Sequence, residues 1–125
     1  MPATAFRQAV EHGDFDAATE LLADDVVFRS PAVFKPYQGR ETVATILRTV
    51  VQVFEDFRYT DELAGDGVHA LIFETRVGDR KLQGMDLIRP GADGRIAELT
   101  VMVRPASGLM ALGERMGPAL AAAGV

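Results

Sequence analysis

The sequence predicts an α+β domain in which helices pack on one face of a sheet. Two observations lead to this fold class. Apolar residues in the first half recur with the spacing of amphipathic helices, whereas the second half divides into strands at glycine-containing turns. Helices followed by a meander of strands are typical of a mixed domain, and 125 residues supply one core but not two. We therefore expect a single domain over residues 1–125.

Helices and a short strand are predicted in the N-terminal half. An apolar stripe that begins at Phe6 ends near Gly13, a natural helix stop, and Asp14 can cap the helix that follows. A short strand at 26–28 comes next. The clearest helix has apolar side chains at i, i+3, i+4 and i+7, namely Val43, Ile46, Leu47, Val50, Val51 and Phe54.

Four strands and a terminal helix are predicted in the second half. The strands lie near residues 57–64, 68–77, 81–89 and 95–103. They are separated by turn sequences, Gly65-Asp66-Gly67, Gly78-Asp79 and Asp93-Gly94. The tail near residues 106–123 is rich in alanine, leucine and methionine and predicts a helix, which Gly113, Gly117 and Pro118 weaken.

Composition excludes several functional classes. The absence of cysteine excludes disulfides, thiol catalysis and cysteine-bound metals. The net charge of −5 argues against nucleic acid as a partner, and no apolar run approaches the roughly 20 residues needed to cross a bilayer. A soluble cytoplasmic protein is expected. The acidic and histidine residues near the first helix end straddle a helix break, so neither a metal nor another cofactor is expected.

Asp86 is the main candidate functional residue. Counting by twos along its predicted strand places it with Leu82 and Ile88 on the more apolar face. An ionised carboxylate there is costly, so Asp86 must find a partner, stay protonated or line a wet cavity. Two interpretations remain open: a functional group in a pocket, or a buried carboxylate satisfied by a hydrogen bond or water.

The predicted turns place other residues beside Asp86. If the turn after residue 77 holds two residues, Leu71 pairs with Asp86 and His69 lies on the diagonal. An equally tight turn at Asp93-Gly94 sets Val101 beside Asp86. A turn one residue longer would move every side chain of the following strand to the opposite face of the sheet. The two counts agree on one apolar face, formed by Leu71, Phe73, Leu99, Val101 and Val103.

His69 is the candidate catalytic partner of Asp86. An Asp–His couple can act as an acid/base pair near neutral pH, although His69 can equally be a neutral histidine at the pocket edge. Tyr59 and Asp61 can share this face but are expected at the rim or the surface. Ser30 either caps the bend that follows it or faces the pocket.

Five short segments stand in a recognisable order: Gly13-Asp14-Phe15-Asp16, Leu22-Ala23-Asp24-Asp25-Val26-Val27-Phe28 followed by Pro31, Gly39-Arg40-Glu41, Asp93-Gly94-Arg95-Ile96 and Val103-Arg104-Pro105. This pattern covers nearly the whole chain and resembles the nuclear transport factor 2-like superfamily, in particular its SnoaL-like and ketosteroid-isomerase-like branches. The resemblance implies a cone-shaped fold, with a curved antiparallel sheet and N-terminal helices that enclose an apolar pocket. Because members of this superfamily differ in chemistry, it implies no particular reaction.

The resemblance also implies where the site of a ketosteroid isomerase would fall. The general base would be at Ser30, the oxyanion-hole tyrosine at Phe6 and its supporting tyrosine near Leu47. The protonated aspartic acid of the oxyanion hole, which an apolar site keeps neutral in that enzyme, would be at Asp86, and the same state for Asp86 is a hypothesis. Because the base is missing, isomerisation by the usual mechanism is not expected.

These observations lead to two functional hypotheses. In the first, the pocket binds a small, mostly apolar metabolite, with isomerase-, cyclase- or dehydratase-like acid/base chemistry at Asp86 and His69. In the second, the chain is a non-catalytic binding or assembly module with the same pocket. A further possibility is that side chains fill the pocket and only the dimer face matters. The expected ligand contacts are Phe6, Phe28, Ser30, Leu47, Tyr59, Leu71, Phe73, Leu99 and Val101.

The second face of the predicted sheet is also rather apolar. A sheet covered by helices on one face normally carries polar residues on the other. Here that outer face carries Val68, Ala70, Ile72, Met85, Leu87, Thr100 and Met102. We therefore expect a homodimer that forms through it.

Overall fold

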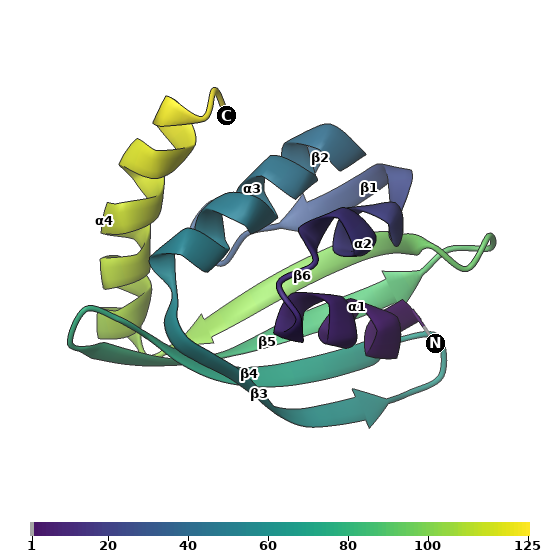
Figure 1. The fold of residues 1–125 in the computed structure, drawn as a ribbon, viewed down its shortest axis with the longest axis horizontal. Helices are drawn as coiled ribbons and strands as arrows, with labels where there is room; N and C mark the ends of the chain where they lie inside the picture. The colour runs from purple at the N-terminus through teal and green to yellow at the C-terminus, as the bar shows by residue number, and fades with distance from the viewer. Residues whose placement is uncertain (1) are drawn as a thin grey trace.

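The computed structural model describes residues 2–125 and has four helices and six strands (Figure 1). The helices are α1 (Pro2–Glu11), α2 (Phe15–Glu20), α3 (Arg40–Val53) and α4 (Ala106–Ala122). The strands are β1 (Leu22–Arg29), β2 (Tyr37–Gln38), β3 (Glu55–Ala64), β4 (His69–Val77), β5 (Arg80–Pro90) and β6 (Ile96–Arg104). The predicted α+β class is confirmed.

One six-stranded sheet forms the base of the molecule, in the order β2-β1-β6-β5-β4-β3. Strands β1 and β6 are parallel, and the other neighbours are antiparallel. Figure 1 shows the sheet curving around α1, α2 and α3, which lie on its concave side, while α4 stands at one end beside α3. No helix within residues 2–125 is long and apolar enough to cross a membrane.

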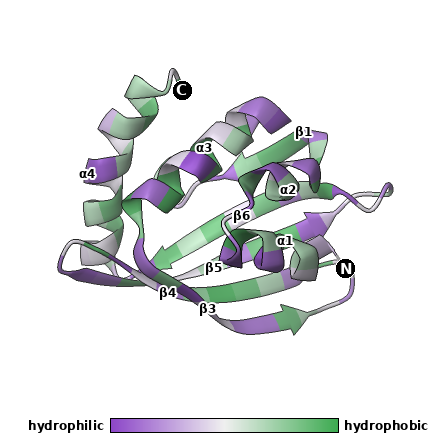
Figure 2. Cartoon of the chain, in the orientation of Figure 1, coloured by the Kyte–Doolittle hydropathy of each residue, from purple (hydrophilic) through white to green (hydrophobic). Residues whose placement is uncertain are grey.

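Local patterns explain the helices of the first half. The Asp14 side chain accepts a hydrogen bond from the Ala17 backbone N–H at 3.1 Å, so it caps α2 as expected. Helix α3 buries Val43 and Ile46 on the face predicted from the apolar spacing. Figure 2 shows hydrophobic residues along the inner strands, whereas the edge strand β3 is mostly hydrophilic, as suits an unpaired sheet edge.

The register of β4 against β5 is confirmed. Leu71 pairs with Asp86 and His69 with Ile88, as a two-residue turn at Gly78-Asp79 requires. Gly78 adopts a φ of 62°, which only glycine reaches without strain in a tight hairpin turn.

The turn between β5 and β6 differs from the prediction, although the pairing does not. Gly91 N–H bonds to the Arg95 carbonyl, so the loop holds three residues rather than two. Gly94, with a φ of 81°, completes this loop, and the register shifts by one residue next to Pro90. Since the shift offsets the extra residue, Val101 still pairs with Asp86.

A second irregularity separates Tyr59 from Asp61. Tyr59 pairs with Phe73, but after a register shift Asp61 pairs with Ile72. The bulge at this point reverses the alternation, so Tyr59 is buried on the inner face and Asp61 is exposed. The expectation that both residues lie at the rim or the surface is therefore corrected for Tyr59.

Candidate functional site

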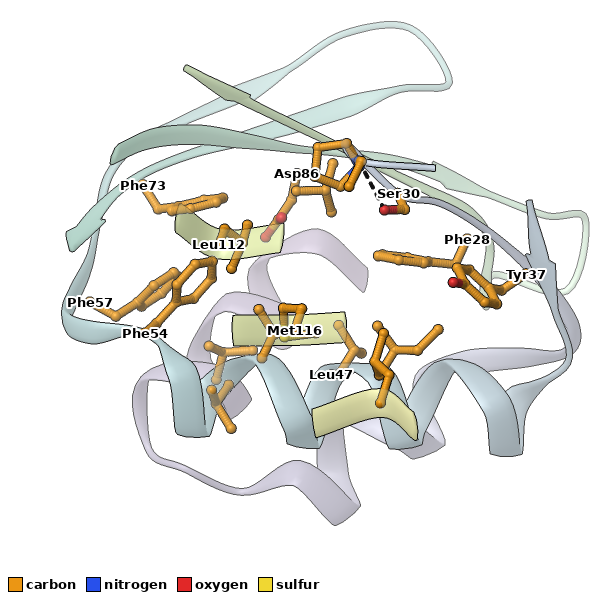
Figure 3. Close-up of a pocket in the computed structure, with 18 of the residues that line it drawn as sticks. Phe28, Ser30, Tyr37, Leu47, Phe54, Phe57, Phe73, Asp86, Leu112 and Met116 are labelled. Carbon is orange, nitrogen blue, oxygen red and sulfur yellow. Dashed lines mark hydrogen bonds between the residues drawn. The ribbon is translucent and has the colours of Figure 1, made fainter. Parts of the chain in front are cut away.

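A cavity of about 300 Å³ lies between the inner face of the sheet and the helices (Figure 3). Its walls come from the helices α1 to α4, from the strands and from the segment after β1. At the roughly 24 cal/mol per Å³ measured for enclosed cavities, an equal void in a packed core would cost about 7 kcal/mol. That is comparable with the whole stability of a small domain. The space is thus a substantial feature of the fold.

Most of the cavity wall is apolar, and one part of it is aromatic. The ring of Phe57 lies 5.0 Å from that of Tyr59 and 5.0 Å from that of Phe73, measured between centroids. Phe54 stacks on Phe57 at 5.7 Å. Figure 3 shows Phe54, Phe57 and Phe73 grouped on one side, with Phe28 and Tyr37 on the other. These rings give the cavity rigid walls that suit an apolar ligand.

Asp86 is the acidic residue of this cavity. It is 8% exposed, and its carboxyl group points from β5 into the space between the aromatic groups (Figure 3). The Tyr59 hydroxyl donates a hydrogen bond to Asp86 Oδ2 at 3.1 Å. The other oxygen, Oδ1, has no hydrogen-bond partner among residues 2–125, and Asp86 lines the cavity.

Burial sets the protonation of this pair. Removal of the Asp86 carboxyl from water raises its pKa from 3.8 to about 7, although the hydrogen bond from Tyr59 partly opposes the rise. Burial, and then the charge of Asp86, raise the pKa of Tyr59 above its ordinary value. Tyr59 therefore stays protonated and donates, while Asp86 exists in both protonation states near neutral pH.

The cavity contains many, but not all, of the residues predicted to contact a ligand. Seven of the nine line it, namely Phe6, Phe28, Ser30, Leu47, Tyr59, Phe73 and Val101. The structure places Leu71 and Leu99 elsewhere, in the closed core with Phe6 and Ala9 of α1. Strand parity put both leucines on the correct face, but both belong to the closed core, in the region where α1 contacts β4.

His69, the predicted catalytic partner of Asp86, does not line the cavity. It is buried on the inner face of β4 at its first residue, opposite Ile88. Tyr59 occupies the position beside the carboxyl that His69 was expected to take. The physical reason is the β3 bulge, which turns the Tyr59 side chain inward two strands away from Asp86.

Ser30 fulfils both of the interpretations left open for it. Its Oγ accepts a hydrogen bond from the Ala32 backbone N–H at 3.1 Å, which caps the bend before β2. It also lines the cavity near Asp86 (Figure 3). Because the hydroxyl oxygen accepts this hydrogen bond, its proton can be donated to a ligand. A neutral serine hydroxyl is, however, a much weaker base than a carboxylate.

Sequence reasoning missed several parts of the wall. Phe57 could have been found, because it precedes Tyr59 by two residues and shares its face. Tyr37 follows an irregular loop, and Met116 lies on a helix whose apolar residues give no single face, so neither carried a usable signal. Within residues 2–125, no three histidine, aspartate or glutamate side chains gather as a metal-binding group.

Fold and site together define a class of protein: a cone-shaped α+β domain whose apolar cavity holds one buried carboxyl group. The SnoaL-like domain family matches residues 3–99, and the chain belongs to this family. No curated protein sequence matches the chain significantly.

Solved structures support the same assignment. The chain is 48% identical to a steroid delta-isomerase from Pseudomonas aeruginosa, with a TM-score of 0.91 over 97% of this chain and 90% of that one. It is 34% identical to an uncharacterised protein with a cystatin-like fold from Silicibacter pomeroyi, with a TM-score of 0.88 over 94% and 83% of the two chains. An NTF2-like protein from Cytophaga hutchinsonii, 18% identical with a TM-score of 0.66 over 85% and 89%, shares the fold.

Proposed function

We propose that the cavity binds a small, mostly apolar metabolite and that Asp86 exchanges a proton with it. One observation carries this proposal: a buried carboxyl group faces the apolar cavity with a free oxygen, and its pKa is near 7. General acids and bases work best when their pKa lies near the pH at which they act. Among residues 2–125, the other ionisable side chains of the wall are the phenols of Tyr37 and Tyr59.

The same arrangement limits the ligand. The apolar wall cannot replace the water around a charged molecule, so a ligand with one or a few neutral polar groups is favoured. A carbonyl oxygen near Asp86 Oδ1 would accept a hydrogen bond from the protonated acid. A ligand carbon next to that carbonyl would be acidic enough to lose a proton to the ionised form.

Tyr59 acts on Asp86 and is therefore a positioning residue in this proposal. Its hydroxyl holds Oδ2, which leaves Oδ1 for the ligand. Its ring is fixed by Phe57 and by the Arg7 guanidinium, which lies 5.7 Å from the ring centroid. In a proton shift within a ligand, Asp86 would take a proton from one carbon and return it to another, with Tyr59 unchanged throughout.

The likeness to the Pseudomonas aeruginosa steroid delta-isomerase supports an isomerase-type reaction on a polycyclic ketone. A direct test uses androst-5-ene-3,17-dione, with formation of the conjugated enone followed by ultraviolet absorbance. We expect turnover by the wild type and a loss of at least 100-fold in kcat for Asp86→Asn, since proton transfer by a side chain contributes about 10²–10⁴-fold. Equal turnover by both proteins would remove Asp86 from the chemistry.

The pH dependence of kcat/KM then assigns the role. If ionised Asp86 takes the proton, the rate rises with pH and levels above about 7. If protonated Asp86 donates a hydrogen bond, the rate falls above the same pH. A rate independent of pH between 5 and 9 contradicts both roles.

A non-catalytic binding protein is the second candidate function. It is favoured by Ser30 and Phe6, which stand where the resemblance would place a base and a tyrosine. In that case the wild type binds the conjugated product androst-4-ene-3,17-dione but turns over no isomer. Binding of the dione is measured by changes in the NMR spectrum of cavity residues.

A further inference from the structure

Helix α4 carries three glycines, and their surroundings differ. A Cβ added at Gly108 would meet the Leu82 side chain at 2.8 Å and the Lys81 carbonyl oxygen at 3.0 Å, so close packing requires a glycine there. At Gly113 and Gly117 an added Cβ would meet nothing within 4 Å. Packing therefore explains the first glycine and neither of the other two.

Backbone conformation does not require Gly113 either. A glycine inside a helix is less favourable than an alanine, because it loses more conformational freedom on folding. Gly113 has no positive φ that would exclude a side chain. Gly117 is a different case, since it precedes Pro118 and a Cβ before proline disfavours the helical conformation. Gly113 thus weakens the helix without a reason in the folding of the chain.

Gly113 lines the same cavity as Asp86. It lies between Leu112 and Met116 on the side of α4 that helps to close this space, and it is half-buried. A Cβ at this position would enter space with no protein atom within 4 Å. The buried carboxyl of Asp86, with one oxygen unpartnered, is an independent indication that this volume receives a ligand.

We propose that Gly113 determines the size of the ligand, because its missing side chain leaves room along α4 for the bulk of a molecule with more than one ring. This proposal rests on the proposed function and specifies its substrate class. The whole cavity, at about 300 Å³, equals the volume of roughly ten waters at about 30 Å³ each, which exceeds what a single six-membered ring fills. A one-ring ketone fits without the space at Gly113, whereas a fused-ring ketone requires it.

The test compares Gly113→Leu with Ala121→Leu. Ala121 lies on the same helix, is exposed and does not line the cavity, so the control adds the same side chain outside the site. Binding of cyclohexanone and of androst-4-ene-3,17-dione is followed by NMR. We expect Gly113→Leu to lose at least tenfold in affinity for the four-ring dione and less than twofold for cyclohexanone, and Ala121→Leu to change neither. Equal losses for both ketones, or no loss for the dione, overturn the proposal.

Two further measurements separate this inference from the proposed function. If the wild type binds neither ketone, the proposed function fails, and benzene and naphthalene then test the volume alone, because they need no polar partner. Gly113→Leu should still bind benzene and lose naphthalene by at least tenfold; unchanged naphthalene binding, or none by the wild type, overturns the inference. Gly113→Ala should raise the urea midpoint of unfolding, since it adds a helix-favouring residue in open space. A lower midpoint would mean that the glycine serves the fold.

Discussion

Replacing Asp86 with asparagine should stabilise the protein at high pH and leave its stability nearly unchanged at low pH. The amide is neutral at every pH and keeps an oxygen that can accept the hydrogen bond from Tyr59. Any pH-dependent difference between the two proteins therefore reports the ionisation of Asp86. The prediction follows from burial, which raises the pKa of this carboxyl to about 7.

The sign follows from proton binding in the two states. Below about pH 4, Asp86 holds its proton in both the folded and the unfolded chain. Between about pH 4 and pH 7, only the folded chain holds it, so the free energy of unfolding falls as the pH rises. Above pH 7, Asp86 is ionised in both states, and the free energy of unfolding stays lower by the full cost of burying the charged carboxylate. A rise from 3.8 to about 7, at about 1.4 kcal/mol for each pH unit, gives roughly 4 kcal/mol.

Urea unfolding of the wild type and of Asp86→Asn at intervals from pH 4 to pH 9 measures this difference. Other titrating groups are common to both proteins and cancel. The increase in the free energy of unfolding of Asp86→Asn over the wild type should grow from pH 4 to pH 7 and then stay constant. Asp66→Asn, which changes an exposed carboxylate in a loop, is the matched control and should stay within about 0.5 kcal/mol at every pH. A gain for Asp86→Asn that is the same at pH 4 and pH 8 would refute the reasoning.

Three other predictions follow from the structure. Tyr59→Phe removes the hydrogen bond that lowers the pKa of Asp86, so carboxyl-carbon NMR should find that pKa above its wild-type value; a fall would contradict the geometry. Gly84→Ala places a methyl group against the ring of Phe73 and should reduce the free energy of unfolding by about 1–3 kcal/mol in urea, whereas an unchanged midpoint would mean that the ring moves freely. We also propose a homodimer through the outer sheet face, so light scattering at micromolar concentration should find a dimer for the wild type and a monomer for Met102→Glu, in which a charge enters an exposed apolar position. A wild-type monomer would exclude this interface.

The position of Asp86 was predictable because it depends on local rules. Side chains alternate along a strand, and the tight turn at Gly78-Asp79 fixes which residue of β4 lies opposite. Even so, the agreement at Val101 came from two departures that offset each other, a longer loop and a register shift beside Pro90. Alternation within a strand is thus more reliable than any assumed turn length.

The partner of Asp86 was not predictable from the same rules. Tyr59 reaches it from β3, two strands away, across β4. Bulges interrupt β3 on both sides of Tyr59, so a count by twos that starts at either end of the strand does not give the face of Tyr59. Residue propensities and the spacing of apolar residues do not predict the position of a bulge, because a bulge forms where the curvature of the whole sheet requires it.

By itself, the sequence determined the order of helices and strands apart from the two-residue strand β2, the apolar inner face and the inward direction of Asp86, because periodicity acts over a few neighbouring residues. The tertiary structure decided which part of that face is closed core and which part is cavity. Leu71 and Leu99 lie in the closed core, whereas Asp86 and Val101 line the cavity together with residues of α3 and α4. That division depends on where the helices lie across the curved sheet, so it arises from contacts between segments far apart in the chain.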